Sequence, residues 1–234
     1  MALRFVRRYR DDPSAPTVRS FVRDVAVRGL VPALLLIPAV YLVGEHLLPP
    51  GGVLGEQAVN QALQGGRTPV LDVIVSSVSH AAGVVGAPLT AIVAFFALRR
   101  HTGQWWLAAV PLTAVALEAL VYQTTTVLVG RERPEGVEQM DWGLPNSSFP
   151  SGHVGASTSL VVVFALLAWS GEHRGRAWLV TLGGAAWVVA VAASRLYLGM
   201  HHVSDAVAGV VIGTVCSLIG WNALRRGGRE RAGD

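Results

Sequence analysis

The chain has 234 residues, of which 52% are hydrophobic and 15% charged, and its formal net charge is +4. This composition is typical of one domain that crosses a membrane several times. All 19 basic side chains are arginines, and they are dispersed between apolar segments rather than collected on one polar face, which excludes nucleic acid as the expected partner. The single cysteine, Cys216, excludes a disulfide framework and a cysteine-based metal site.

Six apolar segments are long enough to cross a bilayer, because about 20 helical residues span its hydrocarbon core. They cover residues 29–48, 81–98, 104–129, 153–170, 177–193 and 203–221. Residues 69–80, which include Asp72, are expected to approach the second span along the membrane interface. The sequence therefore predicts an all-α bundle of six transmembrane helices at residues 29–224, flanked by polar tails at residues 1–28 and 225–234.

The arginines are divided unevenly between the two sides of this bundle. Six spans place both termini on one side, which then carries 15 arginines, whereas the other side carries four. These four are Arg67, Arg131, Arg133 and Arg195. Because cytoplasmic loops are enriched in arginine and lysine, both termini are expected in the cytoplasm, with the protein in the cell (inner) membrane of a bacterium. A site built around the four remaining arginines would face outward, at the outer membrane face.

A group of ionisable residues lies between the last two spans: Arg195, His201, His202 and Asp205. Such groups are costly near hydrocarbon, so they indicate a functional site. His201 and Asp205 are four residues apart, so on a helix they share a face. The carboxylate would there hold one ring nitrogen and leave the other free to attack or to take a proton. Arg195 offers a planar fork of donors suited to phosphate. His202 is expected to be a neighbour at the membrane interface.

Three motifs resemble the signatures of the type 2 phosphatidic acid phosphatase superfamily. The third signature, Ser-Arg, five residues, His, three residues, Asp, is present from Ser194 to Asp205, and the second, Pro-Ser-Gly-His, occupies residues 150–153. The first, Lys, six residues, Arg-Pro, ends at Arg133 and Pro134 but begins with Thr126 in place of lysine. All three occur in the family's order and between the appropriate apolar segments.

The resemblance implies a membrane enzyme that hydrolyses a lipid phosphate without a metal or another cofactor. His201 would attack phosphorus and form a phosphohistidine, while Asp205 would orient the attacking ring. His153 would protonate the departing alkoxide and then activate water. Arg133 and Arg195 would supply the positive charge that stabilises the phosphoryl oxygens in the transition state.

Phosphate binding also involves the start of one helix and the altered first motif. Ser151 and Gly152 are expected to begin the fourth span, where free backbone N–H groups bind anions, and Gly152 lets the backbone approach the phosphate. Thr126 has a hydroxyl where the family has a cation, which leaves Arg131 as a partial substitute.

Other interpretations of these residues stay open. His153, His201 and Asp205 are the residue types of a 2-His-1-carboxylate metal site, although the neighbouring arginines would repel a cation. Glu118 lies inside the third span on the same helix face as Thr126. It is either a functional group or a protonated carboxyl that bonds to a neighbouring helix.

The sequence thus predicts an integral membrane hydrolase of a lipid phosphate or diphosphate, such as undecaprenyl diphosphate or another polyprenyl diphosphate, or phosphatidic acid. A phosphotransferase that uses the same phosphohistidine is one alternative. A non-catalytic lipid-binding membrane protein, supported only by the missing lysine, is another. The residues identify neither the lipid nor the oligomeric state.

Overall fold

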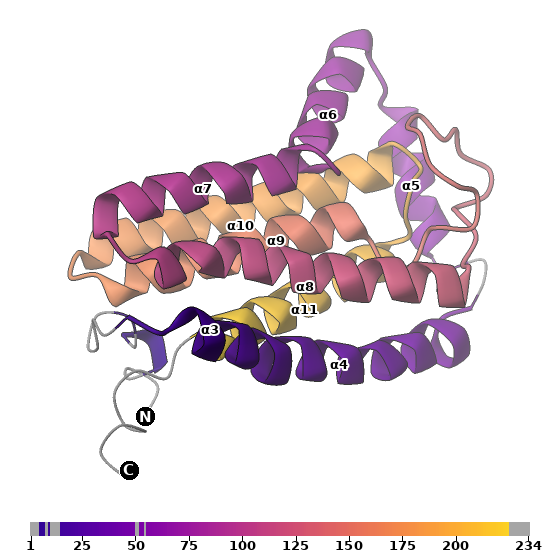
Figure 1. Cartoon of the computed structure of the whole chain (residues 1–234). Coiled ribbons are helices and arrows are strands. Elements are labelled where there is room, and N and C mark those ends of the chain that lie inside the picture. Colours follow the sequence, from indigo (N-terminus) through magenta and orange to yellow (C-terminus); the bar gives the residue numbers. More distant parts are fainter. Residues whose placement is uncertain (1–4, 8, 10–14, 50–51, 54, 225–234) are drawn as a thin grey trace.

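The computed structural model describes residues 5–7, 9, 15–49, 52–53 and 55–224, and within these ranges it contains helices and loops but no β-strand. The all-α class predicted from the sequence is confirmed. The predicted tail at residues 225–234 and part of that at residues 1–28 lie outside the described residues. The elements are α3 (Val18–Asp24), the π-helical η1 (Val25–Leu30), α4 (Val31–Leu42), the π-helical η2 (Val43–Leu47), α5 (Glu56–Gly65), α6 (Pro69–Ala82), α7 (Gly86–Thr102), α8 (Trp105–Val129), α9 (Gly152–Ser170), α10 (Arg174–Tyr197) and α11 (Val203–Ala223) (Figure 1).

Among the described residues, five helices are long and apolar enough to cross a membrane, and the bent pair α6–α7 makes a sixth span if it is counted as one. The five are Val18–Leu47, Trp105–Val129, Gly152–Ser170, Arg174–Tyr197 and Val203–Ala223. The first begins well before the predicted residue 29, because Thr17 caps it. The Thr17 Oγ1 accepts the N–H of Ser20 at 3.2 Å, and the helix then continues from α3 into α4.

The helices α6 and α7 meet at an angle of 54°. Gly83 leaves the helix in an extended conformation, and Gly86 starts α7 so close to the preceding turn that a Cβ there would lie 2.5 Å from the carbonyl carbon of Ala81. The predicted boundary between the interfacial approach and the second span, at residue 81, is therefore displaced to this bend. Helix α6 projects away from the bundle (Figure 1).

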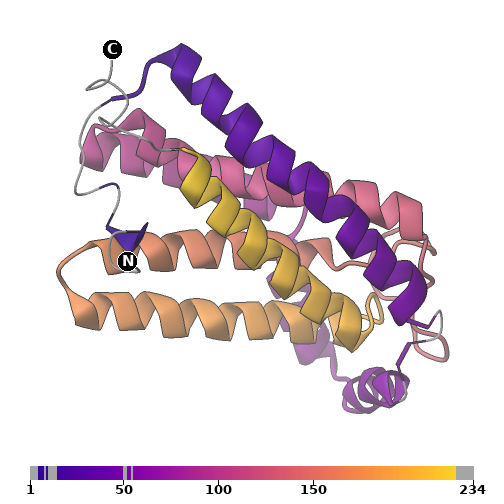
Figure 2. The same cartoon turned by 90° about the horizontal axis from the view of Figure 1, so that it is seen from below.

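Helix α9 occupies the centre of the bundle and packs against α8, α10 and α11. Figure 2 shows α11 running obliquely to α9 and α10. Glycines on α11 allow the two backbones to touch: a Cβ at Gly209 would lie 2.6 Å from the carbonyl oxygen of Ser151, and one at Gly213 would lie 2.9 Å from Thr158 Cβ. Small residues permit such close packing in lipid. The start of α9 is thereby held against the first turns of α11.

The short helix α5 supports the loop between α10 and α11. Asn60 is fully buried and donates its amide to the carbonyl oxygens of Leu196, at 2.8 Å, and His201, at 3.1 Å. Gln64 donates to the carbonyl oxygen of Tyr197 at 3.0 Å. Because these bonds satisfy buried carbonyl groups, they hold the loop that carries His201 in one conformation.

Candidate active site

The residues of the three motifs converge at one end of the bundle, where α9 and α11 begin and α10 ends. Backbone hydrogen bonds join the segments that carry them. The backbone N–H of Ser148 donates to the carbonyl oxygen of Arg131 at 3.0 Å, and that of Ser151 donates to the carbonyl oxygen of Asp205 at 3.1 Å. The N–H of Met140 donates to the carbonyl oxygen of Leu198 at 3.0 Å. The loop at residues 130–151 thus lies against both the α10–α11 loop and α11.

His201 is buried in the loop before α11, with 3% of its surface exposed. Its Nδ1 lies 2.6 Å from the carbonyl oxygen of Ser148, so this nitrogen carries the proton and donates it. Burial, together with the positive charges of Arg195 and Arg133, lowers the pKa of His201 well below its ordinary value. The imidazole is therefore neutral, and its Nε2 has a free lone pair.

Asp205 does not hold His201 as the sequence predicted. The Asp205 Oδ2 is 4.0 Å from Nδ1 of His201, but it accepts the backbone N–H of His202 at 2.7 Å and lies 3.2 Å from its Nδ1. The helix begins only at Val203, so the four-residue spacing does not place His201 on a shared helical face. Asp205 instead closes a capping box with His202. His202 is 1% exposed, so it is buried within the protein beside Asp205.

Arg131 is bound by the protein on several sides. Its guanidinium donates to Asp205 Oδ1 at 2.5 Å and to Ser204 Oγ at 2.9 Å. It also donates to the carbonyl oxygen of Pro49 at 3.0 Å and pairs with Glu56 at 3.7 Å. These acceptors occupy both Nη groups of Arg131, whereas its Nε is buried without a partner among the described residues, so its part in binding phosphate stays a prediction. Arg131 stabilises the buried carboxylate of Asp205.

Arg195, at the end of α10, is 2% exposed. Its Nη1 donates to Ser79 Oγ and to Asp141 Oδ2, both at 2.5 Å. Its Nε is buried and has no hydrogen-bond partner among the described residues. A buried donor without an acceptor is costly, and a phosphoryl oxygen would satisfy it.

Arg133 is 7% exposed and held by the carbonyl oxygens of Leu144 and Met200, both at 2.8 Å, and by Ser147 Oγ at 2.9 Å. Burial and the nearby charge of Arg195 lower the pKa of Arg133. Two guanidinium groups of like charge thus lie close together in a buried place. Such an arrangement favours an anion between them.

Asp141 and Ser79 are contacts of Arg195 that sequence reasoning missed. Asp141 lies in the loop before the second motif, and Ser79 lies on α6. Although burial opposes it, the hydrogen bond and charge of Arg195 keep the pKa of Asp141 below its ordinary value. The carboxylate is therefore ionised. Neither residue belongs to one of the three motifs, so no sequence pattern pointed to this pair.

The start of α9 differs in detail from the prediction. The N–H of Ser151 is used by the carbonyl of Asp205, so it is not free for an anion, but the Ser151 Oγ is buried without a partner among the described residues. A Cβ at Gly152 would lie 2.8 Å from the ring of Tyr122, so the tyrosine requires this glycine. The first-turn N–H groups of Gly152 and His153 still point out of the helix.

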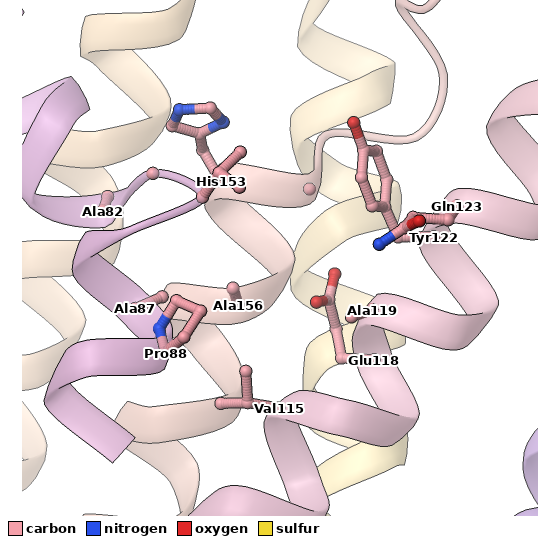
Figure 3. Close-up of a pocket in the computed structure, with 13 residues that line it drawn as sticks. Ala82, Ala87, Pro88, Val115, Glu118, Ala119, Tyr122, Gln123, His153 and Ala156 are labelled. Atoms are coloured by element: carbon pink, nitrogen blue, oxygen red, sulfur yellow. The ribbon is translucent and has the colours of Figure 1, made fainter. Parts of the chain in front are cut away.

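A cavity of about 140 Å³ lies next to His153, between the α6–α7 bend, α8 and α9. Figure 3 shows Tyr122 and His153 at one end of it, with Glu118 extending towards them from α8. Thr126, one turn beyond Tyr122, is buried but does not line this cavity. Within the described part of the chain, no group of three or more His, Cys, Asp or Glu side chains is placed to hold a metal ion.

These features define an integral membrane protein with a buried, positively charged site at one end of a helical bundle. The family model of the PAP2 superfamily matches residues 107–229, which are more than half of the chain and include all three motifs. The chain belongs to the PAP2 superfamily. It is a phosphoric ester hydrolase of the lipid-phosphate class.

Two solved structures resemble this fold. One is the first transmembrane PAP2-type phosphatidylglycerolphosphate phosphatase from Bacillus subtilis, with 18% identity and a TM-score of 0.65, over 83% of this chain and 94% of that one. The other is Aquifex aeolicus LpxE, with 20% identity and a TM-score of 0.56, over 70% of this chain and 93% of that one. At such identities the likeness concerns the fold alone. Among curated protein sequences, none matches this chain.

Proposed function

We propose that the chain hydrolyses a lipid phosphate or diphosphate through a phosphohistidine on His201. The observation that supports this most is the buried ring of His201, held through Nδ1 by the Ser148 carbonyl with its Nε2 unused, in the same site as the buried guanidinium groups of Arg133 and Arg195. A neutral imidazole is a nucleophile, and fixed cations stabilise the charge on the phosphoryl oxygens as the transition state forms.

In the first step, Arg133 and Arg195 bind the phosphoryl oxygens, and the unpartnered Ser151 hydroxyl and the N–H of Gly152 add neutral donors. The Nε2 of His201 forms a bond to phosphorus while the ester P–O bond breaks. His153, which the anionic phosphoryl group beside it brings to its protonated form, gives its proton to the departing alkoxide. The positive charge that develops on His201 is stabilised by the Ser148 carbonyl at its Nδ1–H.

In the second step, His153 is the base. It takes a proton from water, the water oxygen forms a bond to phosphorus, and the P–N bond to His201 breaks. Phosphate leaves and both imidazoles return to their starting states. Asp205 contributes as a positioning residue, because Ser148 donates its hydroxyl to the Asp205 carboxylate at 2.6 Å while its carbonyl holds His201.

The proposed orientation places this site at the outer membrane face and both termini in the cytoplasm. The basic ends of α7 and α10, with Arg99, Arg100, Arg174 and Arg176, lie at the end of these helices remote from the site, in agreement with the positive-inside rule. A cysteine introduced as Gln139→Cys in a Cys216→Ala background should react with an impermeant thiol reagent on intact cells. Labelling only after lysis would contradict the orientation.

The proposed substrates are polyprenyl diphosphates, phosphatidic acid and, from the likeness to the Bacillus subtilis enzyme, phosphatidylglycerolphosphate. The test is release of inorganic phosphate from each lipid by purified protein in detergent, with EDTA present throughout. A phosphotransferase would release little inorganic phosphate, and when an acceptor alcohol is added it would form the phosphate ester of that alcohol instead.

The covalent step is tested separately. With p-nitrophenyl phosphate, whose leaving group departs without a proton, a His153→Ala variant should accumulate phosphohistidine, which mass spectrometry should locate on His201, because the intermediate forms but water is not activated. The matched His201→Ala variant should carry no phosphoryl group. Phosphate release by His201→Ala at the wild-type rate would refute the mechanism.

A further inference from the structure

The cavity next to His153 is mostly apolar, but its wall carries one buried carboxyl group. Its apolar lining includes Ala82, Ala87, Pro88, Val115, Ala119 and Ala156. Its polar lining is Glu118, Tyr122, Gln123 and His153. The volume of about 140 Å³ leaves room for a small polyol.

Glu118 points into this cavity (Figure 3). It is 2% exposed, and it makes no hydrogen bond or ion pair to any residue that the structure describes. A buried carboxyl without a partner is costly in a membrane protein, so its presence calls for a ligand. Helix α9 makes room for it: a Cβ at Gly155 would overlap the carboxyl group of Glu118, and no other group is as near.

The position of the cavity relative to His153 indicates which part of a substrate it receives. In the proposed reaction His153 gives its proton to the ester oxygen of the leaving alcohol, so the carbon atoms next to that oxygen must lie beside His153. The cavity adjoins both His153 and Gly152. The phosphoryl group itself lies towards Arg133 and Arg195, which do not line the cavity.

We propose that this cavity is the subsite for the leaving alcohol, and that Glu118 selects lipid phosphates whose leaving alcohol carries a free hydroxyl near the ester oxygen. The inference rests on the proposed hydrolysis. Glu118 accepts a hydrogen bond from that hydroxyl, as in a glycerol-type head group. A leaving alcohol that is hydrocarbon alone leaves the carboxyl unpaired and is therefore the poorer substrate.

A matched pair of lipids tests this selection: 1-oleoylglycerol 3-phosphate, with a free 2-hydroxyl, and its 2-deoxy analogue. For the wild-type protein we expect kcat/KM to be about tenfold higher for the hydroxylated lipid. Glu118→Ala should bring the ratio close to one. Val127→Ala, on the same helix but 82% exposed, is the control and should keep the wild-type ratio. Gly155→Ala should also lower the ratio, because its new methyl group displaces the Glu118 carboxyl.

A wild-type ratio near one, or a ratio that Glu118→Ala leaves unchanged, would overturn the inference while hydrolysis itself stands. If Glu118→Ala does not survive purification, Glu118→Gln takes its place, since it keeps the shape and replaces the carboxyl group by an amide. We then expect the ratio to fall at least about threefold, and an unchanged ratio overturns the inference. A wild-type protein that hydrolyses neither these lipids nor the other lipid phosphates would refute the proposed function, and the inference with it.

Discussion

The Nδ1 of His201 lies 2.6 Å from the carbonyl oxygen of Ser148, whereas it is 4.0 Å from Oδ2 of Asp205. A backbone carbonyl, rather than a carboxylate, therefore selects the tautomer of the proposed nucleophile. Asp205 reaches His201 only through Ser148, whose hydroxyl it accepts at 2.6 Å. The geometry of the site thus depends on the loop before α9 as much as on α11.

The two adjacent histidines should differ in what they contribute. His201→Ala should lose at least about a hundredfold in kcat, because the proposed nucleophile is gone. His202→Ala should keep more than about a tenth of the wild-type rate but lower the melting temperature, because His202 caps α11 with Asp205. Phosphate release and thermal unfolding in detergent measure both effects. Equal loss of rate in the two variants would contradict the assignment of His201.

Removing the Ser148 hydroxyl should change the rate of hydrolysis only mildly. Ser148→Ala keeps the carbonyl that holds His201, so we expect kcat within about tenfold of the wild type and an unchanged KM. Asp205→Asn should instead destabilise the protein by about 3–5 kcal/mol, because the buried charge of Arg131 loses its partner. Steady-state kinetics and thermal unfolding separate the two variants. A Ser148→Ala variant as inactive as His201→Ala would show that the hydroxyl is essential.

His201 should remain neutral at mildly acidic pH. Its pKa lies well below the ordinary value of 6.5. Near pH 6.5 the His201 imidazole therefore binds a proton in the unfolded chain but not in the folded protein. This group therefore makes the folded state less stable as the pH falls below 6.5. NMR of histidine-labelled protein, assigned with His201→Ala, should show an unprotonated His201 ring at pH 6.5. Titration of that ring at or above pH 6.5 would contradict the structure.

Asp141 should compete with phosphate for Arg195, because its carboxylate lies 2.5 Å from Arg195 Nη1. Asp141→Asn removes a negative charge beside the anion site, so vanadate and phosphate should inhibit hydrolysis at concentrations about three- to tenfold lower. Glu138→Gln is the matched control: Glu138 belongs to the same loop but pairs with Arg67, and inhibition should not change. Weaker inhibition in Asp141→Asn would mean that Asp141 mainly holds Arg195 in place.

Thr126 is the departure from the family's first motif. It is 9% exposed, and a lysine there would extend along α8 towards the site as a point charge. Thr126→Lys should hold or improve kcat/KM on a lipid monophosphate, and vanadate should raise its melting temperature. A buried cation without phosphate nearby would cost several kcal/mol. A variant that loses activity and stability, and that vanadate does not rescue, would show that Thr126 does not line a phosphate site.

The sequence by itself determined the membrane class, the helical segments and the motifs. Apolar length decides whether a helix crosses a bilayer, so the spans that became α8 to α11 could be predicted within a few residues. The motifs depend on local spacing and residue type, which the sequence also displays. The predicted start of the first span and the predicted position of the α6–α7 bend were less accurate. Both depend on local geometry, the Thr17 cap and the close contact of Gly86, rather than on hydropathy.

Only the tertiary structure decided which groups touch. His201 meets Ser148, and Arg195 meets Asp141 and Ser79, across more than 50 residues of chain. The Glu118 carboxyl group fits beside the cavity because the facing residue of α9 is Gly155, which has no side chain. Such contacts follow from the way α9 packs against α8 and α11, and packing is set by the shapes of distant segments. The predicted contact between His201 and Asp205 also depended on the tertiary structure. A four-residue spacing implies contact only inside a helix, and α11 begins two residues after His201.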